Sequence, residues 1–299
     1  MNEGDYDHHD VDALIRLSLA EDLRGGQDVT CAATVPPGAR LHATVRAKQP
    51  GVVCGAALFA RVYRALDSDV ATSLALPDGT VVEPGEVVWE GTGDATAILV
   101  GERTALNLVQ RLSGTATATA QLVAAVAGTR ARILDTRKTT PGLRVLQKHA
   151  VLAGGGANHR QGLHDAVLIK DNHIALMPPG PLGSGPAEAV RRARALLGPA
   201  MTIEVEIEHL ADLAPVIAAG ADIVLLDNFD PTAVAIAVLL RDATPAPDGR
   251  PVLLEASGGI TLATVRAFAL AGVDRISTGI MTHSVTALDL SMRTRADHG

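Results

Sequence analysis

Basic side chains are concentrated in the middle of the sequence. Between Arg130 and Lys170 the chain carries eight Lys and Arg residues against two acids, although its formal net charge is −7. Positive charge focused in a cleft raises the local concentration of an anionic ligand and its rate of association. We therefore predict an anionic substrate. The alternative is a solvated basic helix face, which applies above all to Arg130, Arg132, Arg144 and Lys148.

Two segments of this basic region combine cations with other polar groups. The loop 136–142 holds Arg137, Lys138 and three hydroxyls, including that of Thr139. Arginine can bind a carboxylate with two parallel hydrogen bonds, and lysine supplies a mobile point charge. The segment 154–160 begins as a glycine-rich helix cap and ends in His159 and Arg160, for which the alternative is a capping loop with surface side chains. Both segments suit phosphate or carboxylate.

Acidic residues stand at the ends of two later apolar segments. Glu204, Glu206 and Glu208 alternate with apolar residues, so they share one face of a predicted strand, and Asp227 closes the run 221–226. Burying an ionised carboxylate costs several kcal/mol of stability unless the carboxylate is paired. An inward acid row therefore needs a cation, a sugar hydroxyl or a metal, and Mg²⁺ suits Glu206 and Asp227. The alternative is an exposed edge strand.

Two glycine turns and three histidines complete the candidates. The turns Ser257-Gly258-Gly259 and Ser277-Thr278-Gly279-Ile280 could together cradle a phosphate with main-chain N–H groups and hydroxyls, although each alone is an ordinary turn pattern. His159, His164 and His173 match no familiar ligand spacing, so we do not expect them to form a metal site.

Six short apolar segments alternate with helical stretches in the second part of the chain. We expect strands at 132–135, 166–170, 202–207, 222–227, 252–256 and 274–277. Such alternation is typical of parallel strands joined by helical crossovers, in a barrel or in an open doubly wound sheet. Polar groups follow every strand, whereas an open sheet concentrates them at one crevice, so a six-stranded barrel is favoured. The sequence contains neither GxGxxG at the first helix nor a P-loop.

The first third of the chain has a mixed α+β pattern. We predict a helix that is capped by Asp10 and ends near Gly25, a strand at 41–47 and a helix at 56–66. Strands at 80–82 and 86–90 are expected around a turn at Pro84-Gly85. A long helical run from Glu102 is expected to be interrupted at Ser113-Gly114.

Composition excludes several classes of protein. Of the 299 residues only 2% are aromatic, and with the acidic balance this argues against nucleic-acid binding. Cys31 and Cys54 form no disulfide framework, which suits a reducing compartment. The acidic start of the sequence lacks the pattern of a secretory signal, and the charge-free stretch 112–129 is too polar to span a membrane. We expect a cytoplasmic protein with no membrane partner.

These residues resemble the quinolinate phosphoribosyltransferase family, also called carboxylating nicotinate-nucleotide pyrophosphorylases, over nearly the whole chain. The matching motifs are Gly101–Asn107, Gln110–Gly114, Asp135–Gly142, Gly154–Gly156 with Asn158–Arg160, Ile169–His173, Leu226–Asn228, Glu255–Gly259 and Thr282–Ser284. The resemblance implies an N-terminal α/β sandwich domain at 1–112, completed by 284–299, and a six-stranded α/β barrel at 113–283, as in type II phosphoribosyltransferases.

The resemblance also implies a reaction and a set of roles. Quinolinate and phosphoribosyl pyrophosphate, with Mg²⁺ and no organic cofactor, would give nicotinate mononucleotide, pyrophosphate and CO₂ in de novo NAD biosynthesis. The residues expected to hold the quinolinate carboxylates are Arg137, His159, Arg160 and Lys170, with Arg103 from the partner subunit of a homodimer or higher oligomer. Lys138 would face the pyrophosphate, and Glu206 and Asp227 the ribose hydroxyls and the metal. The residues expected at the 5-phosphate are Ser257, Gly258, Gly259, Thr278, Gly279 and Ile280, and those expected to be catalytic are Lys138, Lys170, Glu206 and Asp227.

Three other functions are weighed against this one. They are transfer to a different acceptor, as in molybdenum-transport-associated paralogues, an aldolase-like reaction with Lys170 as a Schiff-base lysine, and non-catalytic phosphosugar binding. The segments 178–185 and 243–250 look like insertions outside the site. Thr278 and Ile280 differ from the residues expected at their positions, which leaves the main chain as the firmer phosphate ligand there.

Overall fold

The computed structural model describes residues 6–66 and 68–297, so the expectations for residues 1–5 and 298–299 lie outside the described residues. The chain forms two compact units. The first contains the described residues up to Ala120 together with 139–155 and those from Met281 onward, and the second contains 121–138 and 156–280. In the described residues no helix is both long enough and apolar enough to cross a membrane.

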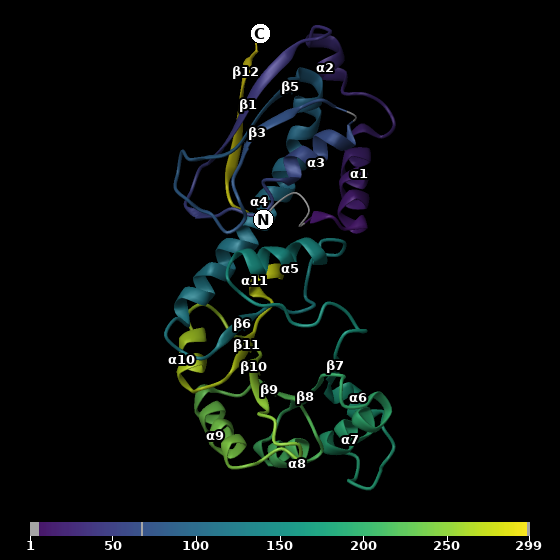
Figure 1. The fold of residues 1–299 in the computed structure, drawn as a ribbon, viewed down its shortest axis with the longest axis vertical. Coiled ribbons are helices and arrows are strands. Elements are labelled where there is room, and N and C mark those ends of the chain that lie inside the picture. The colour runs from purple at the N-terminus through teal and green to yellow at the C-terminus, as the bar shows by residue number, and fades with distance from the viewer. Residues whose placement is uncertain (1–5, 67, 298–299) are drawn as a thin grey trace. The chain divides into compact units, whose positions relative to one another are not determined.

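An antiparallel sheet of four strands forms the centre of the first unit (Figure 1). Its order is β12-β1-β5-β3, and the strands are β12 (Leu290–Ala296), β1 (Arg40–Ala47), β5 (Val87–Asp94) and β3 (Ala71–Ala75). A separate pair joins β2 (Gly51–Val52) to β4 (Val81–Val82). The predicted strands at 41–47, 80–82 and 86–90 are therefore confirmed, but the last two do not pair with each other. The sequence analysis did not predict β3.

Helices contribute buried side chains to the core of the first unit, among them α1 (His9–Leu23), α3 (Leu58–Ala65) and α5 (Arg144–Ala153). The chain also forms α2 (Val29–Thr34) and the short α11 (Ile280–His283). Trp89 of β5 stacks on Phe59 of α3 with the ring centroids 4.7 Å apart. The predicted cap of α1 is wrong, because His8 is the capping residue and its side chain accepts the N–H of Asp10, which lies in the first turn.

The long helix α4 (Ala95–Ala125) is continuous, so the predicted interruption at Ser113-Gly114 is wrong. The Ser113 hydroxyl accepts the N–H of Cys54 at 3.0 Å and lies 3.2 Å from its carbonyl oxygen. A Cβ on Gly114 would lie 2.2 Å from the carbonyl oxygen of Thr286. The small residues therefore allow the main chain of other segments to approach the helix, and they do not end it.

Six parallel strands form the sheet of the second unit, which confirms the six predicted strands to within one residue at most ends. The order is β6-β11-β10-β9-β8-β7, and the strands are β6 (Arg132–Leu134), β11 (Arg275–Ser277), β10 (Leu253–Ser257), β9 (Ile223–Asp227), β8 (Ile203–Ile207) and β7 (Val167–Ile169). Ala157 adds an isolated parallel bridge to Leu134. Because β8 pairs with both β7 and β9, the alternative of an exposed edge strand for the acid row is excluded.

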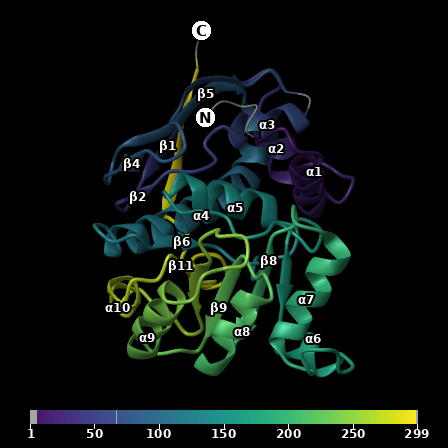
Figure 2. The ribbon, with the colours of Figure 1, turned by 60° about the horizontal axis from the view of Figure 1, so that its bottom comes forward.

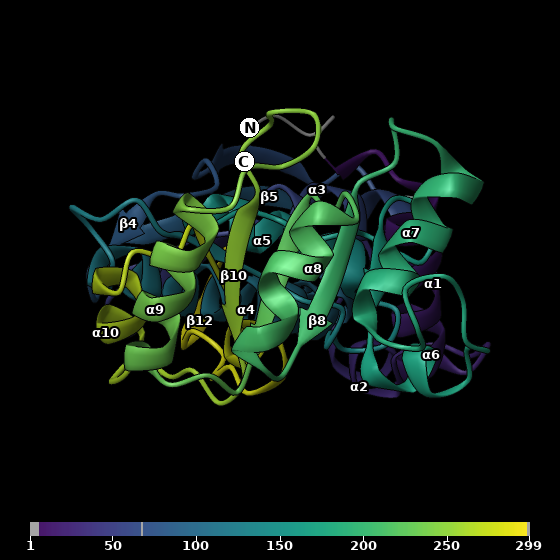
Figure 3. The same cartoon turned by 90° about the horizontal axis from the view of Figure 1, so that it is seen from below.

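Helices connect these strands and cover the sheet. They are α6 (Asp171–Ala175), α7 (Pro186–Leu197), the 3₁₀ helix η2 (Leu210–Asp212), α8 (Leu213–Ala218), α9 (Pro231–Asp242) and α10 (Val265–Leu270). Figures 2 and 3 show α7, α8 and α9 side by side on one face of the sheet. Since each crossover returns the chain to the same edge, the carboxyl ends of all six strands meet at one edge, where polar residues follow the strands.

Candidate active site

A cavity of about 330 Å³ opens at the carboxyl ends of these strands, within the second unit. Nine of the predicted site residues line it, namely Arg137, Lys138, His159, Arg160, Lys170, Glu206, Asp227, Ser257 and Gly258. The other lining residues are Thr136, Leu168, Leu225, Glu255 and Ser277. The alternation of strands and polar ends in the sequence thus leads to one shared cavity.

Four cations line this cavity. Arg137 and Lys138 follow β6, Lys170 follows β7, and Arg160 lies on the segment between α5 and β7. The Nε of Arg137 is buried and has no hydrogen-bond partner among the described residues, whereas Nη1 of Arg160 donates to the carbonyl of Ala166 at 3.2 Å. Burial, and then the charge of Arg137, lower the pKa of Arg160. Neighbouring guanidinium groups that are partly desolvated are prepared to bind an anion.

Two carboxylates face the same cavity from β8 and β9. The Nζ of Lys170 donates to Glu206 Oε2, and the Glu206 side chain is 9% exposed against 43% for Lys170. Asp227 ends β9, and its Oδ2 accepts the side-chain N–H of Asn228 at 2.8 Å. The third member of the predicted acid row, Glu208, lies beyond the end of β8 and is exposed.

A second ionic group includes two residues of the cavity wall, His159 and Glu255. The Nε2 of His159 lies 2.9 Å from Glu204 Oε2 and 3.5 Å from Glu255 Oε1, and Arg275 Nε donates to Glu255 Oε2 at 2.7 Å. Burial disfavours the imidazolium of His159, but the two carboxylates favour it, and the net effect raises the pKa of His159. Burial and the facing Glu204 carboxylate raise the pKa of Glu255. The group thus brings two buried carboxylates, those of Glu204 and Glu255, into contact with the basic side chains of His159 and Arg275.

The turn after β10 brings the main chain close to Asp227. Gly258 has φ +99°, and a Cβ on it would lie 2.3 Å from Asn228 Oδ1. Asn228 itself has φ +58°, and its N–H donates to the carbonyl of Ser257 at 3.1 Å. Only glycine fits at position 258, because a positive φ strains other residues and the space is filled. The next glycine, Gly259, has open space around its Cβ position.

Six predicted site residues do not line the cavity. Gly259, Thr278, Gly279 and Ile280 belong to the same unit, at the ends of β10 and β11. The Thr278 hydroxyl donates to the carbonyl of Ile260 at 3.0 Å. Arg103, exposed on α4, and Thr139, whose hydroxyl accepts from Arg144, belong to the first unit.

Sequence reasoning missed three residues with clear contacts in the site. Glu204 appeared only as part of the acid row, and Glu255 and Asn228 appeared only within motifs. A single acid inside an apolar strand, as at Glu255, is the signal that could have identified the buried pair. The alternative of a solvated face is wrong for Lys148, which is 1% exposed on α5.

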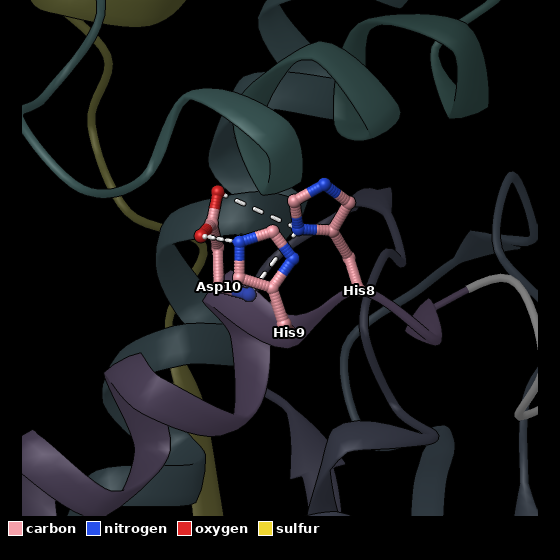
Figure 4. A group of neighbouring side chains, drawn as sticks. All are labelled: His8, His9 and Asp10. Carbon is pink, nitrogen blue, oxygen red and sulfur yellow. Dashed lines mark hydrogen bonds and ion pairs between the residues drawn. The ribbon is translucent and has the colours of Figure 1, made fainter.

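Three groups of side chains could hold a metal ion by the closeness of their ligand atoms. One is the His159, Glu204 and Glu255 group, and the others are Cys54 with Asp78 and His149, and His8 with His9 and Asp10. Figure 4 shows the last group at the start of α1, where His9 Nε2 lies 2.9 Å from Asp10 Oδ1 in an exposed position. Neither His164 nor His173 joins any of these groups, in the part of the chain that the structure describes.

The two insertions lie away from the residues of this cavity. The loop 178–185 is held by Glu188 of α7, whose Oε2 accepts the N–H of Leu182 at 3.3 Å. The loop 243–250 lines another cavity, together with Arg130, Arg241 and Asp274. Each arginine there is paired with an aspartate, for example Arg241 with Asp274 at 2.6 Å.

Two family models match the chain. Residues 28–113 match the N-terminal domain of quinolinate phosphoribosyl transferase, and residues 115–293 match its C-terminal domain. Together the two matches include every predicted site residue.

Named relatives and solved structures agree with these matches. A probable carboxylating nicotinate-nucleotide pyrophosphorylase of Bacillus subtilis is 46% identical over 84% of this chain and 82% of its own. The Mycobacterium leprae enzyme of that name is 41% identical over 93% of this chain and 95% of its own. The structure of the nicotinate-nucleotide pyrophosphorylase from Francisella tularensis superposes with a TM-score of 0.85 at 38% identity, covering 96% of both chains.

Proposed function

Since the chain belongs to the quinolinate phosphoribosyl transferase family, we propose that its cavity transfers phosphoribosyl from phosphoribosyl pyrophosphate to quinolinate. The reaction releases pyrophosphate and CO₂ and forms nicotinate mononucleotide, a step of de novo NAD biosynthesis. The observation that supports this most directly is the single cavity lined by Arg137, Arg160 and Lys170 together with Glu206 and Asp227. A pyridine dicarboxylate needs the cations, and a ribose needs the carboxylates.

The cations hold the acceptor. Quinolinate carries two adjacent carboxylates, and Arg137 and Arg160 present planar forks that match carboxylate geometry. One ion pair at about 4 Å contributes roughly 4 kcal/mol at an effective dielectric near 20, before desolvation is subtracted. Two carboxylates therefore need several cations, and Lys170 supplies a third when its ammonium turns from Glu206 to the ligand. His159 was expected to share this role, but both of its ring nitrogens contact groups of the protein.

The carboxylates and Lys138 serve the donor. Loss of pyrophosphate from the ribose C1 develops positive charge there, which Glu206 and Asp227 stabilise from the floor of the cavity. Lys138, exposed at the end of the loop after β6, neutralises the leaving group. The new N–C1 bond makes the pyridine a pyridinium, and its positively charged nitrogen stabilises the electron pair that stays on the adjacent ring carbon when CO₂ departs. A proton from solvent then completes the ring, so this step requires no base.

Magnesium fits this donor set. Mg²⁺ prefers carboxylate oxygens and substrate phosphates, and it commonly binds through one or two carboxylates with the remaining positions filled by water and phosphate. Glu206 and Asp227 offer two such oxygens on neighbouring strands, where Glu206 of β8 pairs in register with Leu225 of β9. When bound, Mg²⁺ neutralises charge on the pyrophosphate. Glu206 and Asp227 would hold it together with the donor.

A homodimer completes the proposal. Arg103 is exposed on α4, where it is accessible to a second copy of the chain, and the family resemblance assigns it to the acceptor of the partner subunit. Arg103→Ala is expected to raise the KM for quinolinate far more than the KM for phosphoribosyl pyrophosphate. Mixing Arg103→Ala protein with Lys170→Ala protein is expected to restore part of the activity, because half of the mixed sites would contain both side chains. Equal effects on both KM values, with no restoration, would refute the shared site.

The decisive experiment is a direct assay. Purified protein with quinolinate, phosphoribosyl pyrophosphate and Mg²⁺ should form nicotinate mononucleotide and CO₂ in equal amounts. A transferase for another acceptor would leave quinolinate unchanged, and a phosphosugar-binding regulator would bind the donor without turnover. Borohydride with carbonyl substrates would trap Lys170 only in an aldolase-like enzyme. No nicotinate mononucleotide in the first assay would refute the proposal.

A further inference from the structure

His159 is engaged by the protein at both of its ring nitrogens. Its Nδ1 accepts the main-chain N–H of Arg160 at 2.7 Å, and its Nε2 lies 2.9 Å from Glu204 Oε2. The ring is nearly buried, with 8% of the side chain exposed, and the Glu204 side chain is 3% exposed. A ring in this arrangement has no nitrogen left for a carboxylate of the substrate. Its expected role as a direct ligand of quinolinate therefore needs another explanation.

We propose that Glu204 is a positioning residue that fixes His159 and, through it, the Arg160 side chain that holds the acceptor. This inference rests on the proposed function and concerns how the same site selects quinolinate. Glu204 lies on β8, which is hydrogen-bonded to β7 on one side and to β9 on the other, so the main chain that carries its carboxylate is held in place. A hydrogen bond from Nε2 to that carboxylate sets the rotation of the imidazole, and the rotated ring presents Nδ1 to the N–H of Arg160.

Other contacts make the segment around His159 rigid. The main-chain N–H of His159 donates to Asp135 Oδ1 at 2.8 Å, and Ala157 forms a parallel bridge with Leu134 of β6. The segment is thus attached to β6 by its main chain and to β8 by the His159 ring. Removing the second attachment leaves Arg160 free to move relative to the cations of the cavity.

Glu255 supports the same arrangement from β10. Arg275 holds its Oε2 at 2.7 Å, and its Oε1 lies 3.5 Å from His159 Nε2. The Oε1 atoms of Glu204 and Glu255 are both buried without a hydrogen-bond partner among the described residues. Burying carboxylates with unused hydrogen-bonding capacity is unfavourable, which indicates that the two acids serve the site and not the stability of the fold. With a carboxylate on each side of Nε2, the ring has one favourable orientation.

A double-mutant cycle tests this inference. Glu204→Ala is expected to raise the KM for quinolinate by about tenfold, with the KM for phosphoribosyl pyrophosphate changed less than about twofold. Glu204→Gln keeps an accepting oxygen and should stay closer to wild type, and it also keeps the test usable if the alanine variant fails to fold. The matched control is Glu208→Gln on the same run of sequence, since Glu208 is exposed and outside the cavity.

The cycle is completed with His159→Asn, whose shorter amide can accept the N–H of Arg160 but cannot reach Glu204. If Glu204 acts through His159, the double variant should be no worse than the weaker-binding single variant. Independent effects that multiply would overturn the inference, because they would mean that His159 and Glu204 act separately on the acceptor.

A measurement without substrate separates this inference from the proposed function. In ¹⁵N-histidine NMR of the wild type, at a pH where the ring carries one proton, His159 should be protonated on Nε2 and not on Nδ1. The signal is assigned by its loss in His159→Asn, and Glu204→Ala should change the tautomer. A proton on Nδ1 in the wild type would refute the inference even if the enzyme is active, and the expected tautomer in a protein without transferase activity would refute only the proposed function.

Discussion

Gly258 is the position where a single methyl group should damage the donor side of the cavity most. Alanine there must adopt φ +99°, and its Cβ would lie 2.3 Å from Asn228 Oδ1. Left-handed conformations cost a non-glycine residue about 1–2 kcal/mol. Displacing Asn228 also breaks its 2.8 Å hydrogen bond to Asp227, and a hydrogen bond to a charged group contributes about 1.5–3 kcal/mol. The two effects together amount to roughly 2.5–5 kcal/mol.

A control variant separates the effect of backbone strain at Gly258 from the effect of its close contact with Asn228. Gly128 has φ +79° with nothing within 4 Å of its Cβ position, so Gly128→Ala should cost only the conformational strain. Urea unfolding should therefore show Gly258→Ala to be less stable than Gly128→Ala by about 1.5–3 kcal/mol. Because 1.4 kcal/mol corresponds to about tenfold in affinity, the KM for phosphoribosyl pyrophosphate should rise about tenfold or more in Gly258→Ala alone.

The double variant Gly258→Ala with Asn228→Gly gives the sharpest result. Removing the Asn228 side chain relieves the close contact, and glycine tolerates the φ of +58° at position 228. Stability should stay below that of Gly128→Ala and the donor KM should stay high, because Asp227 still lacks its amide partner in the double variant. If Gly258→Ala and Gly128→Ala are alike in both stability and donor KM, the reasoning from Asn228 is wrong.

Three further perturbations follow from the structure. Hydrogen bonds from Arg191 and Arg192 lower the pKa of Glu188 to about 2 from an ordinary 4.5, although burial opposes this shift. Glu188 therefore stabilises the fold above pH 4.5, and this contribution is lost as the pH falls toward 2. The Tm difference between wild type and Glu188→Gln should shrink over that range, and a difference independent of pH would refute it. Gly114→Ala should lower the Tm strongly, since its Cβ would lie 2.2 Å from the Thr286 carbonyl oxygen. Gly25→Ala should lower the Tm less, because its Cβ position is in open space and only the strain of φ +75° is added. Removing Mg²⁺ with EDTA should stop turnover and added Mg²⁺ should restore it, with Asp227→Asn requiring more Mg²⁺ than wild type; unchanged turnover in EDTA would refute the magnesium proposal.

Much of the second unit could be predicted because the signal is periodic. Apolar runs of strand length, each followed by a polar residue such as Lys170 or Asp227, are sufficient to infer parallel strands with their functional ends together. All six strands are confirmed, and nine of the predicted residues line one cavity. This prediction is possible because the strands are parallel: a residue that follows any of the strands in the sequence lies at the same edge of the sheet.

Other features depend on packing, which local sequence does not encode. Ser113 and Gly114 have low helix propensity, but their small size is used for close approach of Cys54 and Thr286, so tertiary packing outweighs propensity. The sequence suggests that Lys148 is a surface cation, but its side chain is buried. The sequence around Asn228 does not indicate its role. That role depends on its positive φ and on its close approach to Gly258, and both arise only in the folded chain.

Lys170 connects the two halves of the cavity, and its pairing determines how they are used. Without substrate its ammonium is bound to Glu206, so one cation and one acid neutralise each other at the centre of the site. Acceptor carboxylates compete for Lys170, and a ribose hydroxyl or Mg²⁺ competes for Glu206. Binding of either substrate therefore weakens the pair and leaves the remaining partner available to the other substrate. Two ligands that each release what the other needs bind with positive coupling. We expect quinolinate to bind more tightly when a non-reactive donor analogue is present with Mg²⁺, and Glu206→Gln to remove most of that coupling; independent binding in isothermal titration calorimetry would refute it.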